Sequence, residues 1–76
     1  MQDLLAYIAK GLVDRPDRVS VDAFEEDDAL VLELHVADDD TGKIIGRSGR
    51  TVNAIRSVMR ACGTKHGRRV LVDVVD

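Results

Sequence analysis

The sequence has few cysteine, proline and aromatic residues, and it has no long apolar run. Its 76 residues include one cysteine, one proline, one tyrosine and one phenylalanine, with no tryptophan. A lone cysteine, Cys62, excludes an internal disulfide and a cysteine-rich zinc cluster, which is typical of a reducing compartment. No apolar run approaches the roughly 20 residues that cross a bilayer, and the N-terminus lacks a basic leader. We therefore expect a cytoplasmic protein with no membrane association.

The sequence also lacks the residue sets of an enzyme or a metalloprotein. No nucleophile, base and orienting acid form a recognisable group. A partial P-loop pattern ends in Ile44, where that motif requires Ser or Thr. Cys62 and His66 are four residues apart, but we expect Gly63 to end the helix between them. The sequence therefore predicts a non-catalytic protein with no metal, cofactor or small-molecule substrate.

Composition indicates one folded domain. Hydrophobic residues make up 45% of the chain and charged residues 33%, a balance typical of soluble folded domains and not of disordered tails. A chain of this length buries only about 60% of its unfolded surface on folding, which leaves room for one economical core. We expect a single domain over residues 1–76 without internal repeats.

Charge is distributed very unevenly along the chain. Residues 41–69 carry eight Lys or Arg side chains and no carboxylate, whereas residues 1–40 carry twelve carboxylates and three basic side chains. The net charge of -3 therefore hides a strongly positive segment. Because salt screens charges beyond about 8 Å, the local field decides what binds there. This distribution points to a partner that bears phosphate.

Hydrophobic periodicity predicts three helices and three strands. Leucine and isoleucine recur at helical spacing between residues 4 and 12, and the apolar run 30–36 is typical of a central strand. The predicted elements are a helix over 2–13, strands over 19–25 and 29–37, a short helix over 42–45, a long helix over 50–62 and a strand over 69–75.

The ends of these elements carry their own signals. Pro16 is expected to end the first helix, and Gly63 is expected to cap the long one. Asp38–Asp40 precede the short helix and are expected to cap its free amides. On the long helix, a rotation of 100° per residue places Val58 on the core face with Met59.

The element order α-β-β-α-α-β restricts the topology. The first two strands are joined by a short acidic turn and should pair antiparallel. A right-handed crossover through two helices places the third strand parallel to the second. We therefore expect an α+β fold with a three-stranded mixed sheet and all helices packed on one face.

The segment with the clearest functional signal is residues 46–49, Gly-Arg-Ser-Gly, between the short and long helices. Its two glycines permit close approach of another backbone, and the following helix N-terminus attracts anions. Arg50 adjoins it, while Arg56 and Arg60 extend the positive field along one helix face. A linear polyanion would match this arrangement better than a single phosphate.

Residues 45–55 resemble the core signature of the KH domain, in which a GxxG loop follows an aliphatic residue and precedes aliphatics at helical spacing. The element order is similar to the type II, prokaryotic form. The whole chain, with its Leu-rich first helix and aliphatic-acidic last strand, resembles the KhpA family of small bacterial RNA-binding proteins. This resemblance implies that single-stranded RNA crosses the GxxG loop, with about four bases along an apolar groove.

The resemblance also implies partners and a biological role. It implies homodimers and pairing with a second KH protein, KhpB (also called Jag or EloR). It further implies post-transcriptional regulation, as an RNA chaperone.

The two aromatic residues, Tyr7 and Phe24, lie outside the loop segment. Stacking of bases on aromatic rings therefore cannot supply the affinity for RNA, and binding should be modest and salt-sensitive.

Individual roles follow from the family motif. Gly46 and Gly49 would allow the close approach of the RNA backbone. Ile45 and Val52 would contribute to the groove, whereas Ile55 would face the core. The RNA-contacting residues predicted from the motif and the basic helix face are Lys43, Ile45, Gly46, Arg47, Ser48, Gly49, Arg50, Val52, Asn53, Arg56, Arg68 and Arg69.

Three other interpretations remain open at this stage. The chain could be a protein-interaction or assembly module that acts mainly through a KH-family partner, with RNA binding secondary. It could be a KH fragment of a larger factor, an idea that the initiator Met and complete first helix disfavour. The glycine-lined segment could also be only a turn between packed helices, with a solvated basic face beside it.

Overall fold

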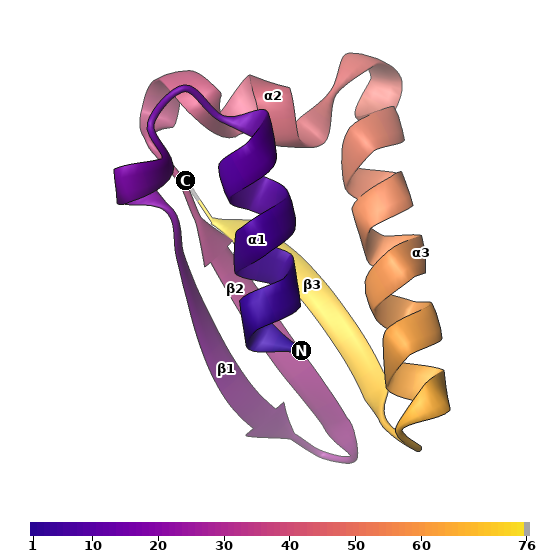
Figure 1. Cartoon of the computed structure of the whole chain (residues 1–76). Helices are drawn as coiled ribbons and strands as arrows, with labels where there is room; N and C mark the ends of the chain where they lie inside the picture. The colour runs from indigo at the N-terminus through magenta and orange to yellow at the C-terminus, as the bar shows by residue number, and fades with distance from the viewer. Residues whose placement is uncertain (76) are drawn as a thin grey trace.

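A computed structural model, which describes residues 1–75, shows a three-stranded sheet with its helices on one face (Figure 1). The helices are α1 (Gln2–Leu12), α2 (Thr41–Ile45) and α3 (Arg50–Lys65), and the strands are β1 (Ser20–Glu26), β2 (Ala29–His35) and β3 (Arg69–Val75). Three short 3₁₀ turns are η1 (Pro16–Arg18), η2 (Asp38–Asp40) and η3 (Arg47–Gly49). This order confirms the predicted α+β class and the order of a type II KH domain.

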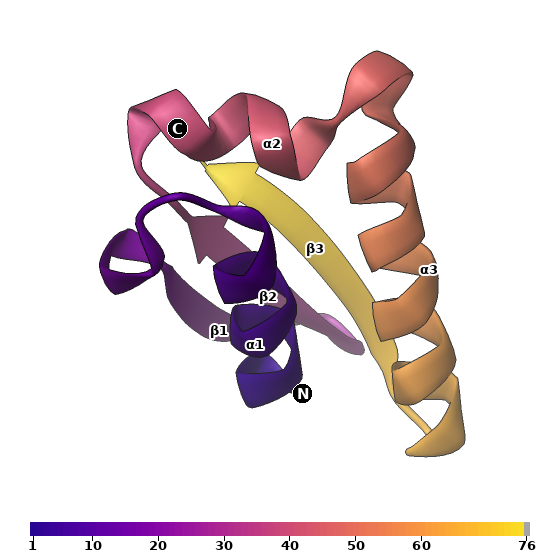
Figure 2. The same cartoon turned by 45° about the horizontal axis from the view of Figure 1, so that its top comes forward.

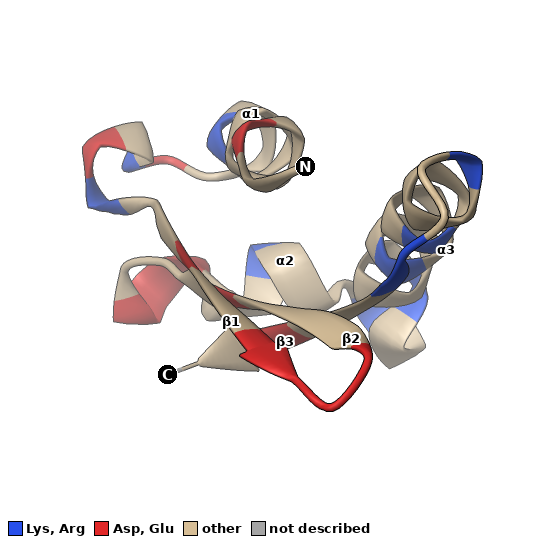
Figure 3. Ribbon diagram, turned by 90° about the horizontal axis from the view of Figure 1, so that it is seen from below, with Lys and Arg blue, Asp and Glu red and all other residues tan. Residues whose placement is uncertain are grey.

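The sheet has the strand order β1-β2-β3. β1 pairs antiparallel with β2, and β2 pairs parallel with β3, as the crossover rule predicts. Ala29 to His35 therefore form the central strand, and β3 is an edge strand beside α3 (Figure 1). A view from below shows α1 and α3 on the same side of the sheet, with the other face uncovered (Figure 3).

The core lies between the helices and the covered face of the sheet. Each element supplies apolar side chains at the period of its own geometry, every second residue from a strand and every third or fourth from a helix. Leu32 and Leu34 of β2 are fully buried, as are Leu5 and Met59 of the two long helices. The remaining buried members of this cluster are Ala9, Ile44, Ile55, Val70 and Val72.

Some predicted element ends are wrong. α1 ends at Leu12, and Val13 is already extended, so Pro16 does not end the helix. Instead Pro16 opens η1, because its fixed φ suits a first helical position. β1 and β2 run from Ser20 to Glu26 and from Ala29 to His35, within two residues of the prediction.

The prediction that Gly63 ends the long helix is also wrong. α3 continues to Lys65, and Gly63 is buried within it. A Cβ at this position would lie 2.6 Å from the carbonyl oxygen of Arg68 and 2.6 Å from Val70, so glycine here permits close packing of α3 on β3.

None of the helices in residues 1–75 is long and apolar enough to span a membrane.

Val58 was predicted on the core face of α3 but is 48% exposed. The buried stripe of this helix passes through Val52, Ile55 and Met59. A rotation of about 100° per residue separates Val58 from Met59, which places Val58 on the flank of the stripe. The basic side chains of the helix lie on the surface beside the buried stripe.

Candidate nucleic-acid interface

The GxxG loop, residues 46–49, connects the end of α2 to the start of α3 (Figure 2). Gly46 has φ 75° and ψ 174°, a combination that is essentially restricted to glycine. A Cβ on Gly46 would overlap the side chain of Thr51 and lie 2.9 Å from its backbone nitrogen. The first glycine is therefore required both by its backbone conformation and by the packing of the first turn of α3.

The second half of the loop is also left-handed. Ser48 has φ 58°, and Gly49 has φ 74°. A Cβ on Gly49 would meet only Asn53, at 3.8 Å from its amide nitrogen, so this glycine leaves open space above the loop. Arg47 and Ser48 therefore lie in an irregular turn between α2 and α3, with Ser48 in a non-helical conformation. Successive amides in such a turn can form a concavity that binds an anion.

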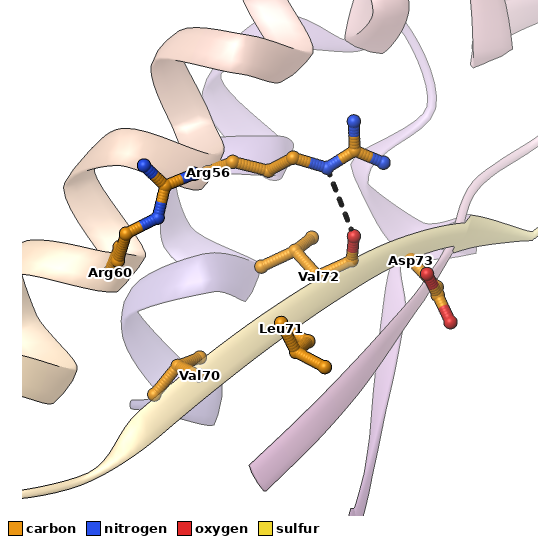
Figure 4. A pocket seen from close by; sticks show the side chains of 6 residues that line it. All are labelled: Arg56, Arg60, Val70, Leu71, Val72 and Asp73. Carbon is orange, nitrogen blue, oxygen red and sulfur yellow. Dashed lines mark hydrogen bonds between the residues drawn. The ribbon is translucent and has the colours of Figure 1, made fainter. Parts of the chain in front are cut away.

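A groove lies between α3 and β3, further along the helix from the loop. Arg56 donates a hydrogen bond from Nε to the carbonyl oxygen of Val72 at 3.1 Å, which fixes its guanidinium across the groove (Figure 4). A cavity of about 250 Å³ lies here, lined by Arg56, Arg60 and residues 70–73. Arg56 is six residues beyond Arg50, so the cavity lies about 9 Å along the helix axis from the loop.

The electrostatic character of this side is positive. Figure 3 shows basic residues on α3, while acidic residues gather at the turn between β1 and β2. Arg47, Arg50 and Arg60 are exposed. None of the three forms an ion pair with a carboxylate in the described residues. Their charges are therefore directed to solvent, where phosphate could be bound.

Lys43, also predicted to contact RNA, forms ion pairs within the protein. Its Nζ lies 3.0 Å from Asp14 Oδ2 and 3.4 Å from Asp40 Oδ1. The hydrogen bond and charge of Asp14, with help from Asp40, raise the pKa of Lys43 above its ordinary value, although burial opposes this. The ammonium group joins α2 to the segment after α1.

Asp40 does not cap α2, contrary to the prediction, and no side-chain cap is found for η2 or α2. Its carboxylate is 1% exposed and accepts hydrogen bonds from the backbone amides of Asp14 at 3.2 Å and Arg15 at 3.1 Å. Burial alone would raise the pKa of Asp40, but these bonds and Lys43 outweigh it and hold the pKa below its ordinary value. Asp40 thus provides a hydrogen-bond acceptor for two backbone amides in the segment that follows α1.

The three aliphatic motif positions differ in exposure. Ile45 is half-buried, whereas Val52 is 5% exposed and Ile55 4% exposed. Ile55 faces the core as predicted. Val52 is nearly as buried as Ile55, so of the two aliphatic residues predicted for the groove only Ile45 has appreciable exposed surface.

The arginine pair at the start of β3 lies far from the loop. Arg68 pairs with Glu25 through its guanidinium Nη2, which donates to the two carboxylate oxygens at 2.7 Å and 2.9 Å. α3 separates this pair from the GxxG loop by its full length of 16 residues, about 24 Å. Arg69 lies level with Ala29 on the sheet, close to the turn after Glu26. The structure therefore places Asn53 beside the loop and Arg56 about 9 Å along α3, whereas Arg68 and Arg69 lie beyond the opposite end of the helix.

Two groups in the described residues contain metal-ligating side chains, both away from the loop. Asp22, Glu33 and His35 place one ligand atom each within 4.8 Å of one another on the uncovered sheet face. Because α3 continues past Gly63, Cys62 Sγ comes within 4.0 Å of His66 Nδ1. His66 Nδ1 is also 2.9 Å from the carbonyl oxygen of Cys62, so this pair is already used within the helix end.

Comparison with known proteins agrees with this geometry. Residues 2–74 match the family model described as KhpA/KhpB, KH domain. The chain belongs to the KhpA/KhpB KH-domain family. It is 47% identical over 76 residues to the RNA-binding protein KhpA of Halalkalibacterium halodurans, with 100% of both chains covered.

Other members of the family are also similar over nearly their full length. The RNA-binding protein KhpA of Clostridium acetobutylicum is 45% identical over 75 residues, covering 99% of this chain and 100% of the relative. That of Borreliella burgdorferi is 43% identical over 74 residues, covering 97% and 90%. No solved structure shows significant similarity. These KhpA relatives are described as binding proteins, which agrees with the predicted non-catalytic character.

The residues of β3 that line the groove were not predicted from the sequence. Sequence reasoning placed the strand beside the groove but selected Arg68 and Arg69 at its start. The structure instead exposes residues 70–73 to the cavity, with the Val72 carbonyl held by Arg56. The signal was present in the topology, because a strand reached by a crossover from the central strand lies at the edge beside the preceding helix.

Proposed function

We propose that this chain binds short single-stranded RNA, with the RNA backbone at the GxxG loop and the bases along the groove between α3 and β3. The observation that carries the proposal is the backbone of the loop, where Gly46, Ser48 and Gly49 all have positive φ and Gly49 leaves open space above the chain. Family membership supports it, because the KhpA relatives are described as RNA-binding proteins.

The geometry suits an unpaired strand better than a duplex. The loop offers amides and the adjoining Arg50 to phosphate, while the cavity at Arg56 offers room for a base about 9 Å further along α3. An RNA duplex keeps its bases stacked inside, so it could present only its backbone. A single strand can occupy both parts of the surface at once.

The proposed biological role is that of a cytoplasmic RNA chaperone in post-transcriptional regulation. One small groove without aromatic residues provides modest affinity and little sequence specificity. A homodimer, or a complex with KhpB, would present two such grooves and gain avidity. The family model, which covers both KhpA and KhpB, supports this assignment of partners.

The test is an RNA titration of an Arg47→Asp/Ser48→Asp variant. Labelled single-stranded RNA is titrated against the variant and the unmodified protein at several salt concentrations. The variant places two carboxylates where phosphate would lie, so affinity should fall by at least about tenfold. The dependence of affinity on salt should also become weaker, because fewer counterions are released.

The chain offers a closely matched control. Arg18 and Ser20 are exposed, lie away from the groove, and allow the same pair of substitutions, Arg18→Asp/Ser20→Asp. This control changes the net charge equally and should retain most of the RNA affinity. Equal losses in the two variants would show that only the net charge matters and would contradict a site at the loop.

A further inference from the structure

The uncovered face of the sheet has a regular arrangement of side chains. Strand register places its residues in rows that run across β1, β2 and β3. From the β1–β2 turn outward, the first three rows are Glu26, Ala29 and Arg69; Phe24, Val31 and Leu71; and Asp22, Glu33 and Asp73. Neighbouring rows are two residues apart, or about 6.8 Å.

The third row consists entirely of carboxylates. Asp22 lies directly opposite Glu33, which lies beside Asp73 in the parallel pair. Like charges that face each other across strands destabilise a sheet. His35 Nε2 lies 3.2 Å from Asp22 and 3.9 Å from Glu33, but Asp73 makes no ion pair within residues 1–75. This row would be stabilised by an external cation.

The second row is apolar and open to solvent. Phe24 is 48% exposed and Leu71 is 42% exposed, on either side of the buried Val31. Figure 4 shows the Leu71 and Asp73 side chains on the opposite side of β3 from α3, so this surface lies on the far side of the edge strand from the helix, and it meets the proposed RNA groove only at these two residues. The second row is therefore an exposed apolar strip between the first and third rows, both of which contain carboxylates.

The first row borders a second cavity, also acidic. Its volume is about 320 Å³, and the residues that line it include Glu26, Asp27 and Asp28 around an apolar floor of Ala29 and Leu71. Arg69 is the one basic residue in this lining. Acidic, apolar and acidic features therefore follow one another at about 6.8 Å intervals along the strands.

We propose that this face binds an extended, positively charged protein segment in which two Lys or Arg side chains flank a large apolar one at alternate positions. In an extended chain, residues i, i+2 and i+4 project from one side at the same spacing of about 6.8 Å. The first cation enters the acidic cavity, the apolar side chain packs between Phe24 and Leu71, and the second cation lies over the carboxylate row.

The charge of the face excludes RNA as this ligand and disfavours a second copy of the chain. Phosphate would be repelled by the carboxylates. The chain has two segments with this residue pattern, Arg56 to Arg60 in α3 and Lys43 to Arg47, in which Lys43 and Ile45 belong to α2. Alternate residues of an α-helix point about 200° apart, so neither helix can present the pattern to another copy.

The test uses a labelled peptide containing Lys-Thr-Leu-Thr-Lys and a permuted peptide containing Lys-Lys-Thr-Thr-Leu. Each is titrated against the full chain at about 150 mM salt, where distant charges are screened, by fluorescence anisotropy and by amide shifts in NMR. The first peptide should bind at least about fivefold more tightly than the permuted one. Its shifts should lie on β1 and β3.

Asp22→Asn/Glu33→Gln should weaken the first peptide about five- to tenfold while RNA affinity stays unchanged. Asp38→Asn/Asp39→Asn removes the same charge from exposed positions in η2 and should have little effect. Equal binding of the two peptides, equal losses in the two variants, or shifts confined to the helices would each overturn the proposal. Dimerisation of the free chain through this face, detected by sedimentation together with concentration-dependent amide shifts on β1 and β3, would also overturn it.

Discussion

Lys43 and Arg47 stand four residues apart, one at the junction of α1 and α2 and the other in the GxxG loop, but their surroundings differ. At the junction, Lys43 lies within 3.4 Å of Asp40 and 3.0 Å of Asp14, and the buried Asp40 accepts two backbone hydrogen bonds. In the loop, the described residues place no carboxylate beside Arg47. One cation stabilises the fold, and the other is free to bind a ligand.

This difference shows that position in a basic segment does not decide what a basic residue does. Residues 41–69 contain no acid, so their charge pattern alone does not separate the eight cations. The fold brings carboxylates from residues 1–40 to Lys43 and Arg68 but not to Arg47 or Arg50. Both cations at the GxxG loop are therefore among those left without a carboxylate partner in the described residues.

The largest expected effect concerns the two glycines of the loop. Gly46→Ala should lower the free energy of unfolding by about 2–4 kcal/mol, because it adds a left-handed strain and an overlap with Thr51. Gly49→Ala meets open space and should cost only about 1 kcal/mol from its positive φ. Urea unfolding of both variants measures the difference. Equal losses in the free energy of unfolding for the two variants would show that the loop relaxes around a methyl group at position 46. The loop would then be less rigid than the junction of α1 and α2.

The loop is also where sequence reasoning worked best. Glycines, arginines and helix signals are local, and each restricts the chain within a few residues of itself. The element order and the mixed sheet were likewise predictable, because few topologies satisfy short, right-handed connections. Local signals therefore predicted the GxxG loop of the candidate site and the path of the chain around it.

The junction could not be predicted, because its contacts join residues about 25 positions apart. Asp40 carries a helix-cap pattern, and nothing near it in sequence shows that the amides of Asp14 and Arg15 need an acceptor. The same holds for Gly63, whose close neighbours Arg68 and Val70 meet it only after α3 packs on β3. Such contacts depend on the tertiary fold, which overrides local cap signals.

Asp40→Asn is the second prediction and tests the junction directly. The pKa of Asp40 is held below its ordinary value in the folded state, so its ionised form stabilises the fold above the ordinary pKa of an aspartate, and this contribution is lost as pH falls through the folded pKa. The variant should melt several degrees lower than the unmodified protein near neutral pH. The difference in melting temperature should narrow as pH falls through the folded pKa of Asp40. Asp39→Asn, at an exposed neighbour, is the control, and a gap independent of pH would contradict the role of the charge.

The third prediction compares the two cations themselves. Arg47→Ala should weaken RNA binding about three- to tenfold and lower the salt slope by about one, as expected for the loss of one phosphate contact. Lys43→Ala should change RNA affinity less than about twofold but lower the melting temperature, since Asp14 and Asp40 lose their partner. An equal loss of salt dependence in both variants would mean that Lys43 leaves its carboxylates when RNA binds.

The smallest expected effect concerns Arg68, which is paired like Lys43 but at the surface. Its guanidinium bonds to Glu25, and both side chains are at least 36% exposed, so Arg68→Ala should cost no more than about 1 kcal/mol of stability. Its RNA affinity should change less than about twofold, because its charge is already used and the loop is about 24 Å away. Titration of the same RNA against Arg68→Ala and Glu25→Ala measures this. A salt slope reduced by about one in the first variant and raised in the second would show that Arg68 exchanges Glu25 for phosphate, so that a paired cation can still serve the RNA surface.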